Sequence, residues 1–137
     1  NHLAAMVRAQ LPMAFQGLVV VPLFCGFDET AGTGRLYSYD VVGGRYEETD
    51  FTATGSGGPY AKAHLRSAFR EGLPEDAALD LAVAALVAAA EEDSATGGPD
   101  LQRGIYPNVV VITAQGYREL PEDRVAAAAR RAMGETR

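Results

Sequence analysis

Along this chain, predicted strands are grouped with other strands and predicted helices with other helices, and the two kinds do not alternate one by one. Apolar residues recur at helical spacing in some stretches, and short β-branched or alternating stretches lie between them. The expected elements are a helix over 1–13, strands over 16–27, 35–40, 45–47 and 50–54, helices over 59–72 and 74–93, strands over 107–113 and 115–120, and a helix over 121–134. Segregated runs of this kind are typical of helices packed on antiparallel sheets. The sequence therefore predicts one α+β domain over residues 1–137.

Charge and hydropathy exclude several classes of protein. The net charge is -6 at pH 7, which argues against binding of nucleic acid or anionic membranes by bulk electrostatics. No stretch reaches the ~18 consecutive apolar residues of a membrane span, and no basic leader with an apolar core is visible. We therefore expect a soluble protein of the cytoplasm.

The cysteine content restricts the redox and metal chemistry of the chain. Cys25 is the single cysteine, which excludes an internal disulfide and a zinc site built from several thiolates. It lies in the most apolar predicted strand, so we expect a buried, inert thiol. Neither His2 nor His64 has a ligand partner three or four residues away, so we expect no catalytic metal.

Three acidic residues end the helix predicted over 74–93, where the helix dipole disfavours negative charge. They are Glu91, Glu92 and Asp93. A solvated acidic helix end is the simpler interpretation, and the functional one is that Asp93 faces a cation such as an amine, a guanidinium or a metal ion. The following residues, Ser94–Gly98, predict either a plain glycine C-cap or a tight loop that closely approaches another group.

A glycine-rich turn, Thr54–Gly58, joins a predicted strand to a predicted helix. Its backbone N–H groups could receive an anion, and Ser56 could act as a nucleophile with His64 and Asp93 as partners. The glycine spacing of a nucleophile elbow is absent, however, and His64 lies well into the next helix. A glycine-rich helix start is therefore the preferred interpretation.

Several of these segments together resemble one family. They are residues 1–28, 39–46, 55–62, the run Asp-Ser-Ala-Thr-Gly-Gly-Pro-Asp at 93–100, and Arg-Gly-Ile-Tyr-Pro at 103–107. In this order they resemble the bacterial, actinobacterial-type 20S proteasome β subunit over essentially the whole chain. The resemblance implies the four-layer αββα sandwich of the N-terminal nucleophile hydrolases, in agreement with the α+β prediction.

The resemblance also implies which part of that fold is present. In the family, removal of a propeptide frees an N-terminal threonine, whose hydroxyl is the nucleophile and whose amine is the base. That threonine, the aspartate and lysine that tune it, the oxyanion-hole glycine and most of the specificity pocket match nothing here. The chain thus resembles the C-terminal portion of a β subunit, without the first strands and first helix. We expect residues 1–137 alone to be inactive and poorly folded, because inner sheet edges would be exposed.

The family implies roles for four side chains and one group of carbonyls. Ser56, Asp93 and Thr96 correspond to residues that hold and polarise the terminal amine of the threonine. Asp28 begins the segment that corresponds to the wall presented to substrate. The backbone carbonyls around Ala90, Asp93 and Thr96 correspond to a cation site found in parts of the family, and no other cofactor is implied.

The implied partners are other β subunits in a heptameric ring, α-subunit rings, an activating ATPase ring and unfolded protein substrates. Two alternatives stay open at this point. One is a non-catalytic ring or scaffold subunit of the same fold. The other is an unrelated serine hydrolase that uses Ser56.

Overall fold

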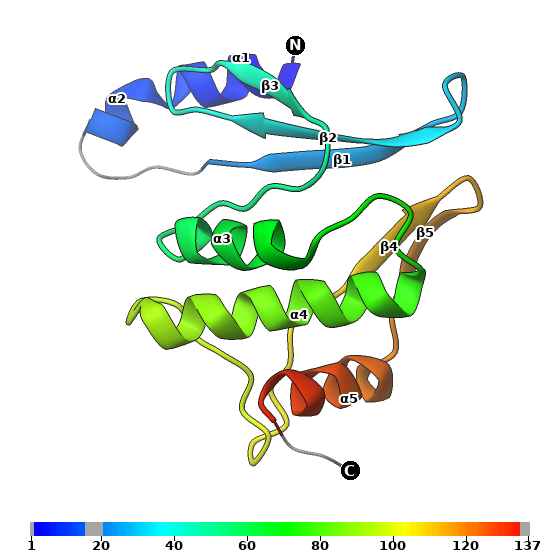
Figure 1. Cartoon of the computed structure of the whole chain (residues 1–137). Coiled ribbons are helices and arrows are strands. Elements are labelled where there is room, and N and C mark those ends of the chain that lie inside the picture. The colour runs from blue at the N-terminus through cyan, green and yellow to red at the C-terminus, as the bar shows by residue number, and fades with distance from the viewer. Residues whose placement is uncertain (1, 16–20, 135–137) are drawn as a thin grey trace.

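The computed structural model describes residues 2–15 and 21–134 and contains helices and antiparallel strands in segregated runs (Figure 1). The elements are α1 (His2–Ala9), α2 (Leu11–Phe15), β1 (Leu23–Asp28), β2 (Thr33–Tyr39), β3 (Arg45–Glu48), α3 (Gly58–Ala68), α4 (Glu75–Glu92), β4 (Val110–Thr113), β5 (Gly116–Glu119) and α5 (Glu122–Ala132). The α+β prediction is confirmed. No helix among the described residues is both long and apolar enough to cross a bilayer.

The first sheet has the strand order β1-β2-β3 and is antiparallel throughout. Leu23 pairs with Ser38 at one end of the β1–β2 ladder and Asp28 with Thr33 at the other, while Tyr39 pairs with Arg45 in the next ladder. Helix α1 lies on the outer side of this sheet, and Arg8 Nη1 donates a hydrogen bond to the Gly43 carbonyl (3.3 Å). Helices α3, α4 and α5 lie on the opposite side of the sheet (Figure 1).

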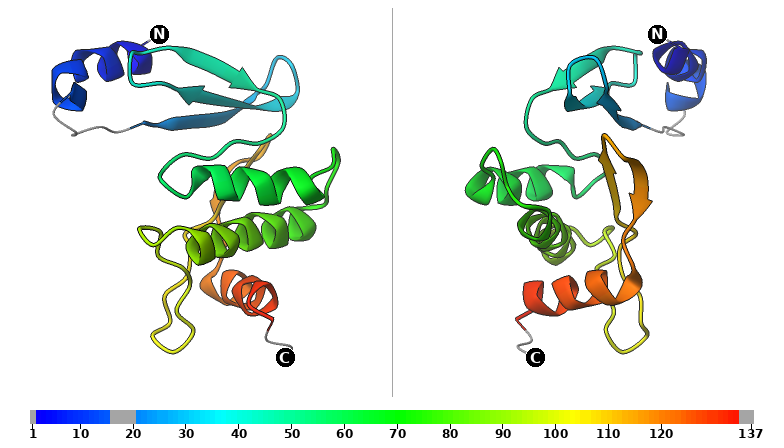
Figure 2. Two further views of the ribbon diagram at one scale, coloured as in Figure 1. Left: turned by 60° about the vertical axis from the view of Figure 1, so that its left-hand side comes forward. Right: turned by 90° about the vertical axis from the view of Figure 1, so that its right-hand side faces the viewer.

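Helices α3, α4 and α5 pack in succession away from the sheet, and the β4–β5 hairpin lies beside them (Figure 2). Small side chains line the α3–α4 contact, where Ala61, Ala85 and Ala89 are all buried. The larger core cluster lies between α4 and α5 and consists of Leu79, Val83, Leu120, Val125, Ala128 and Ala129. Alanine at these contacts lets the helix axes approach closely, because there is little side-chain volume between them.

Helix boundaries follow proline and glycine closely. Pro74 precedes the first residue of α4 and Pro121 precedes that of α5, and Gly134 ends the last helix with φ +78°. The helix predicted over 1–13 is divided into α1 and α2 at Gln10. Pro12, the second residue of α2, has no N–H with which to continue the hydrogen-bond ladder of α1.

Two strand predictions are wrong in part. The fourth strand expected over 50–54 is not a strand, because no described strand pairs with it. The strand expected over 16–27 begins only at Leu23, and residues 16–20 lie outside the described residues. Its first three residues are exposed, Cys25 among them, so the prediction of a buried thiol is wrong.

Candidate functional site

The ends of two helices bring Ser56, Asp93 and Thr96 together. Asp93 follows the last residue of α4, and its amide still donates to the Ala89 carbonyl (2.8 Å). Its own carbonyl accepts the Thr96 amide (3.1 Å), which closes the loop after the helix. Ser56 lies in the turn that precedes α3. The packing of α3 against α4 therefore places residues 37 positions apart side by side.

One carboxylate oxygen is the centre of the cluster. The Ser56 Oγ and the Thr96 Oγ1 both donate hydrogen bonds to Asp93 Oδ2, each at 2.5 Å. The other oxygen, Oδ1, has only a long 3.5 Å contact from the Ala95 amide. The hydrogen bonds from Ser56 and Thr96 lower the pKa of Asp93 below its ordinary value, so the carboxylate is ionised at neutral pH.

The charge of Asp93 is not neutralised within the described part of the chain. No arginine or lysine there forms an ion pair with it, although seven such contacts occur elsewhere. At the acid-rich end of the helix, the Asp93 carboxylate thus accepts hydrogen bonds from two hydroxyls and contacts no cation. Its Oδ1 atom can still accept a hydrogen bond from a further donor. A carboxylate of this kind can bind and orient an ammonium group.

Gly57 was not singled out as a functional residue from the sequence, yet it lets the cluster form. A Cβ at this position would lie 2.5 Å from Thr96 Oγ1 and 3.1 Å from the Ala89 Cβ. Only glycine therefore allows the start of α3 to approach the loop after α4 so closely. The close approach suggested for the loop Ser94–Gly98 was a partial signal for this contact, although it did not name the glycine on the other side.

A pocket of about 700 Å³ borders this cluster at Ser56. It lies between β1 and β2 on one side and the start of α3 on the other, and its charged lining residue is Lys62. His64 does not join the site, because among the described residues the Ser56 hydroxyl donates to Asp93 and not to an imidazole. The serine–histidine contact that a serine hydrolase mechanism needs is therefore missing.

Asp28 lies apart from this cluster, at the end of β1. Its carboxylate accepts hydrogen bonds from the amides of Thr30 and Ala31 and from Arg35 Nε (2.8 Å). The hydrogen bond from Ala31, followed by that from Arg35, lowers the pKa of Asp28. In this structure Asp28 stabilises the β1–β2 turn, and contact with substrate stays a prediction.

The carbonyls named as a cation site surround the same loop. The Asp93 carbonyl already accepts the Thr96 amide, and a carbonyl oxygen has a second lone pair for another partner. No group of three or more His, Cys, Asp or Glu side chains suited to a metal ion occurs in residues 2–15 and 21–134. Cation binding by the carbonyls of Ala90, Asp93 and Thr96 remains a prediction.

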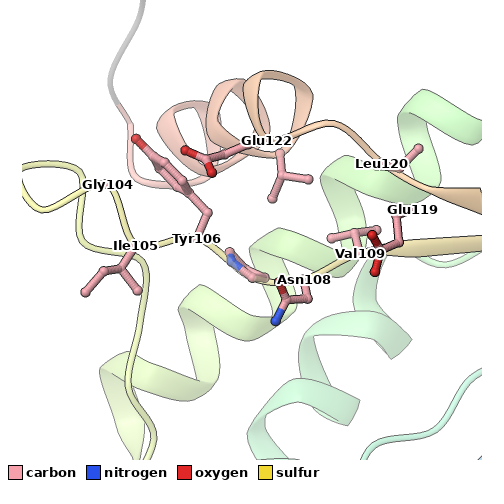
Figure 3. Close-up of a pocket in the computed structure, with 10 residues that line it drawn as sticks. Gly104, Ile105, Tyr106, Asn108, Val109, Glu119, Leu120 and Glu122 are labelled. Carbon is pink, nitrogen blue, oxygen red and sulfur yellow. The ribbon is translucent and has the colours of Figure 1, made fainter.

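A second pocket, of about 350 Å³, is formed by residues 104–109, the end of β5 and the start of α5 (Figure 3). Figure 3 shows the side chains of Tyr106, Asn108, Glu119 and Glu122 drawn around it. Its lining contains no serine, threonine, cysteine, histidine or lysine. We therefore place the candidate chemistry at Asp93 and not in this pocket.

Residues 1–100 match the family described as proteasome subunit, a stretch that contains Ser56, Asp93 and Thr96. The chain belongs to the proteasome subunit family. It is 54% identical over 125 residues to the proteasome subunit beta of Acidimicrobium ferrooxidans and 50% identical over 125 residues to that of Frankia casuarinae. It is 51% identical over 130 residues to the proteasome subunit beta of Streptomyces griseus.

These proteasome relatives are longer than the matched region. The alignments cover 91% of this chain for the first two relatives and 95% for the third, but only 46% of each relative. The chain therefore spans less than half the length of the relatives that it matches. The resemblance to a proteasome β subunit is confirmed, while the activity of a whole subunit is a matter of proposal.

Proposed function

We propose that this chain belongs to a 20S proteasome β subunit, a threonine-type endopeptidase, and supplies the residues that hold the catalytic threonine in position. In this proposal it forms part of the four-layer αββα sandwich of the N-terminal nucleophile hydrolases. The observation that carries the proposal is the Asp93 carboxylate, which holds two hydroxyl donors on Oδ2 and has no cationic partner in the described chain.

The proposed task of Asp93 is to orient the amine of an N-terminal threonine supplied by upstream sequence. An ammonium or amine N–H group placed against Oδ1 would complete the hydrogen bonding of the carboxylate. Ser56 and Thr96 take up part of the negative charge through Oδ2, so they limit how far Asp93 raises the pKa of that amine. The amine can then accept the proton of the threonine hydroxyl as it attacks the peptide carbonyl.

The wider setting is proposed on the family membership. The β subunits would form a heptameric ring stacked on α-subunit rings in the cytoplasm, and unfolded or tagged proteins would reach them through an ATPase activator. No cofactor is required for this chemistry, and a structural cation at the loop of Asp93 would support the fold. Residues 1–137 alone, without a nucleophile, would hydrolyse no peptide.

The experiment compares Asp93→Asn with wild type in the complete protein, with whatever upstream sequence its gene encodes. We expect kcat for a fluorogenic peptide to fall by roughly 10²-fold or more, the range typical of lost acid–base assistance. Glu92→Gln is the matched control, because Glu92 is the neighbouring acid and is exposed at the end of α4. Equal activity of the Asp93→Asn variant and wild type would contradict the proposal.

The second candidate function is that of a non-catalytic ring or scaffold subunit, and it predicts a different result in the same experiment. A complete protein that assembles into rings yet hydrolyses no peptide would favour it. The acidic helix end and the loop after it would then serve assembly.

A further inference from the structure

The turn before α3 contains three glycines, and their backbone conformations differ. Gly55 has φ +99°, whereas Gly57 has φ -84° and Gly58 has no left-handed φ. Residues with a side chain occupy positive φ only in a small region at about +50° to +70°, and only rarely there. Gly55 is therefore the residue of this turn whose backbone conformation requires glycine.

Gly55 changes the direction of the chain immediately before Ser56. The preceding residues, 52–54, belong to no helix or strand, and α3 begins only three residues later. The Gly55 carbonyl accepts a hydrogen bond from the Gly58 amide (3.0 Å), which closes the turn. The direction in which Ser56 projects from this turn therefore depends on the φ angle of Gly55.

The Ser56 hydroxyl points away from its own helix. Serine near the start of a helix commonly accepts a hydrogen bond from one of the first helical amides. The N-cap of α3 is Gly57, which has no side chain for this purpose, and the Ser56 hydroxyl donates across to Asp93 Oδ2 (2.5 Å). The turn thus directs its hydroxyl to the loop after α4 and not to the helix that follows it.

We propose that Gly55 is a positioning residue of the active site, whose left-handed backbone conformation aims the Ser56 hydroxyl at Asp93. The inference rests on the proposed peptidase function, in which Asp93 orients the amine of the threonine. A Cβ at Gly55 would meet no atom within 4 Å, so a side chain there acts through the backbone angle and not through a clash. When φ relaxes toward negative values, Ser56 Oγ moves away from Asp93 Oδ2.

The test measures kcat and KM for a fluorogenic peptide in variants of the complete protein. For Gly55→Ala we expect kcat to fall by about tenfold, as for the loss of one hydrogen bond to a charged group, with KM unchanged. Gly72→Ala is the matched control, because Gly72 has φ +80°, equally open space for a Cβ and a place beyond the opposite end of α3. It carries a similar backbone strain, so its thermal midpoint should fall as well, but kcat should not change.

Two further variants separate positioning from a general loss of structure. Combined with Ser56→Ala, the Gly55→Ala change should lower kcat no further, because the hydroxyl that it misdirects is already absent. Gly55→Asn should retain more activity than Gly55→Ala, since asparagine tolerates positive φ better than alanine does.

The proposal is overturned if kcat is unchanged in Gly55→Ala, if it falls equally in Gly72→Ala, or if the losses of Gly55→Ala and Ser56→Ala multiply in the double variant. If wild type cuts no peptide, the proposed peptidase function fails, and thermal unfolding of the same variants then tests the positioning by itself. Gly55→Ala should lower the thermal midpoint more in wild type than in Ser56→Ala. Equal decreases in the two backgrounds would refute the role of Gly55.

Discussion

Gly57 offers the sharpest test of how the Asp93 cluster is built. A Cβ placed at Gly57 would lie 2.5 Å from Thr96 Oγ1 and 3.1 Å from the Ala89 Cβ. Thr96 would have to move by about 1 Å to restore an ordinary contact distance. Because Thr96 Oγ1 donates to Asp93 Oδ2, this movement would weaken a hydrogen bond that lowers the pKa of Asp93.

The expected cost of Gly57→Ala follows from overpacking and not from backbone strain. Gly57 has φ -84° and ψ -1°, values that alanine adopts readily. Inserting a methyl group into a well-packed contact costs about 1–3 kcal/mol of unfolding free energy. Each kcal/mol corresponds to a thermal midpoint lower by roughly 2–4 °C for a chain of 150–250 residues.

Thermal unfolding and peptide hydrolysis by the complete protein measure the two consequences. Gly97→Ala is the matched control, since it lies next to Thr96, has open space where a Cβ would project, and has no left-handed φ. We expect that control to be neutral or stabilising by about 0.4–1 kcal/mol. A Gly57→Ala protein as stable and as active as the Gly97→Ala protein would refute the packing argument.

Two further predictions follow from the described contacts. Arg118 and Arg124 both donate hydrogen bonds to Glu75 and lower its pKa below the ordinary value of 4.5. Their pairing therefore stabilises the fold at pH values above 4.5, and this stabilisation is lost as the pH falls through the lowered pKa. The thermal midpoint of Glu75→Gln should therefore lie below that of wild type at neutral pH and converge with it in acid, and a gap that does not change with pH would contradict this. Cys25, exposed on β1, should react with a thiol reagent before unfolding, whereas modification only after adding denaturant would show that it is covered.

Prolines and turn residues made several element boundaries of the fold predictable from the sequence. Pro74 and Pro121 precede α4 and α5 as expected, and the β4–β5 hairpin forms around the predicted turn. These boundaries depend on local backbone preferences that a sequence carries within a few residues. The helices and this hairpin could therefore be located without knowledge of their neighbours.

Burial and strand pairing were less predictable, because they depend on which other elements pack against a strand or pair with it. The apolar composition around Cys25 suggested a covered strand, but the first half of β1 is exposed in the described structure. The stretch over 50–54 has strand-like composition but pairs with no strand among residues 2–15 and 21–134. A strand's own residues do not show whether another element packs against it.

The candidate site was predictable in part. The acidic end of α4 suggested a partner for Asp93, and the glycine-rich turn suggested Ser56 as a neighbour of Asp93 in a serine hydrolase site. Only the family resemblance added Thr96 and gave the three residues a shared role in holding an amine. The structure brings these three side chains together, with hydroxyls where a cation was considered. Gly57 could not have been singled out, because the atoms it makes room for come from residues about forty positions away in a separate helix and loop.

The most direct test of the central claim is the intact mass and N-terminal sequence of the native protein, purified from its source as a peptide-hydrolysing complex. The account predicts a species longer than this chain that begins with threonine, with Asp93, Ser56 and Thr96 positioned to orient its amine. A hydrolytically active species that begins at Asn1 would contradict the account, because its active site would contain no N-terminal threonine.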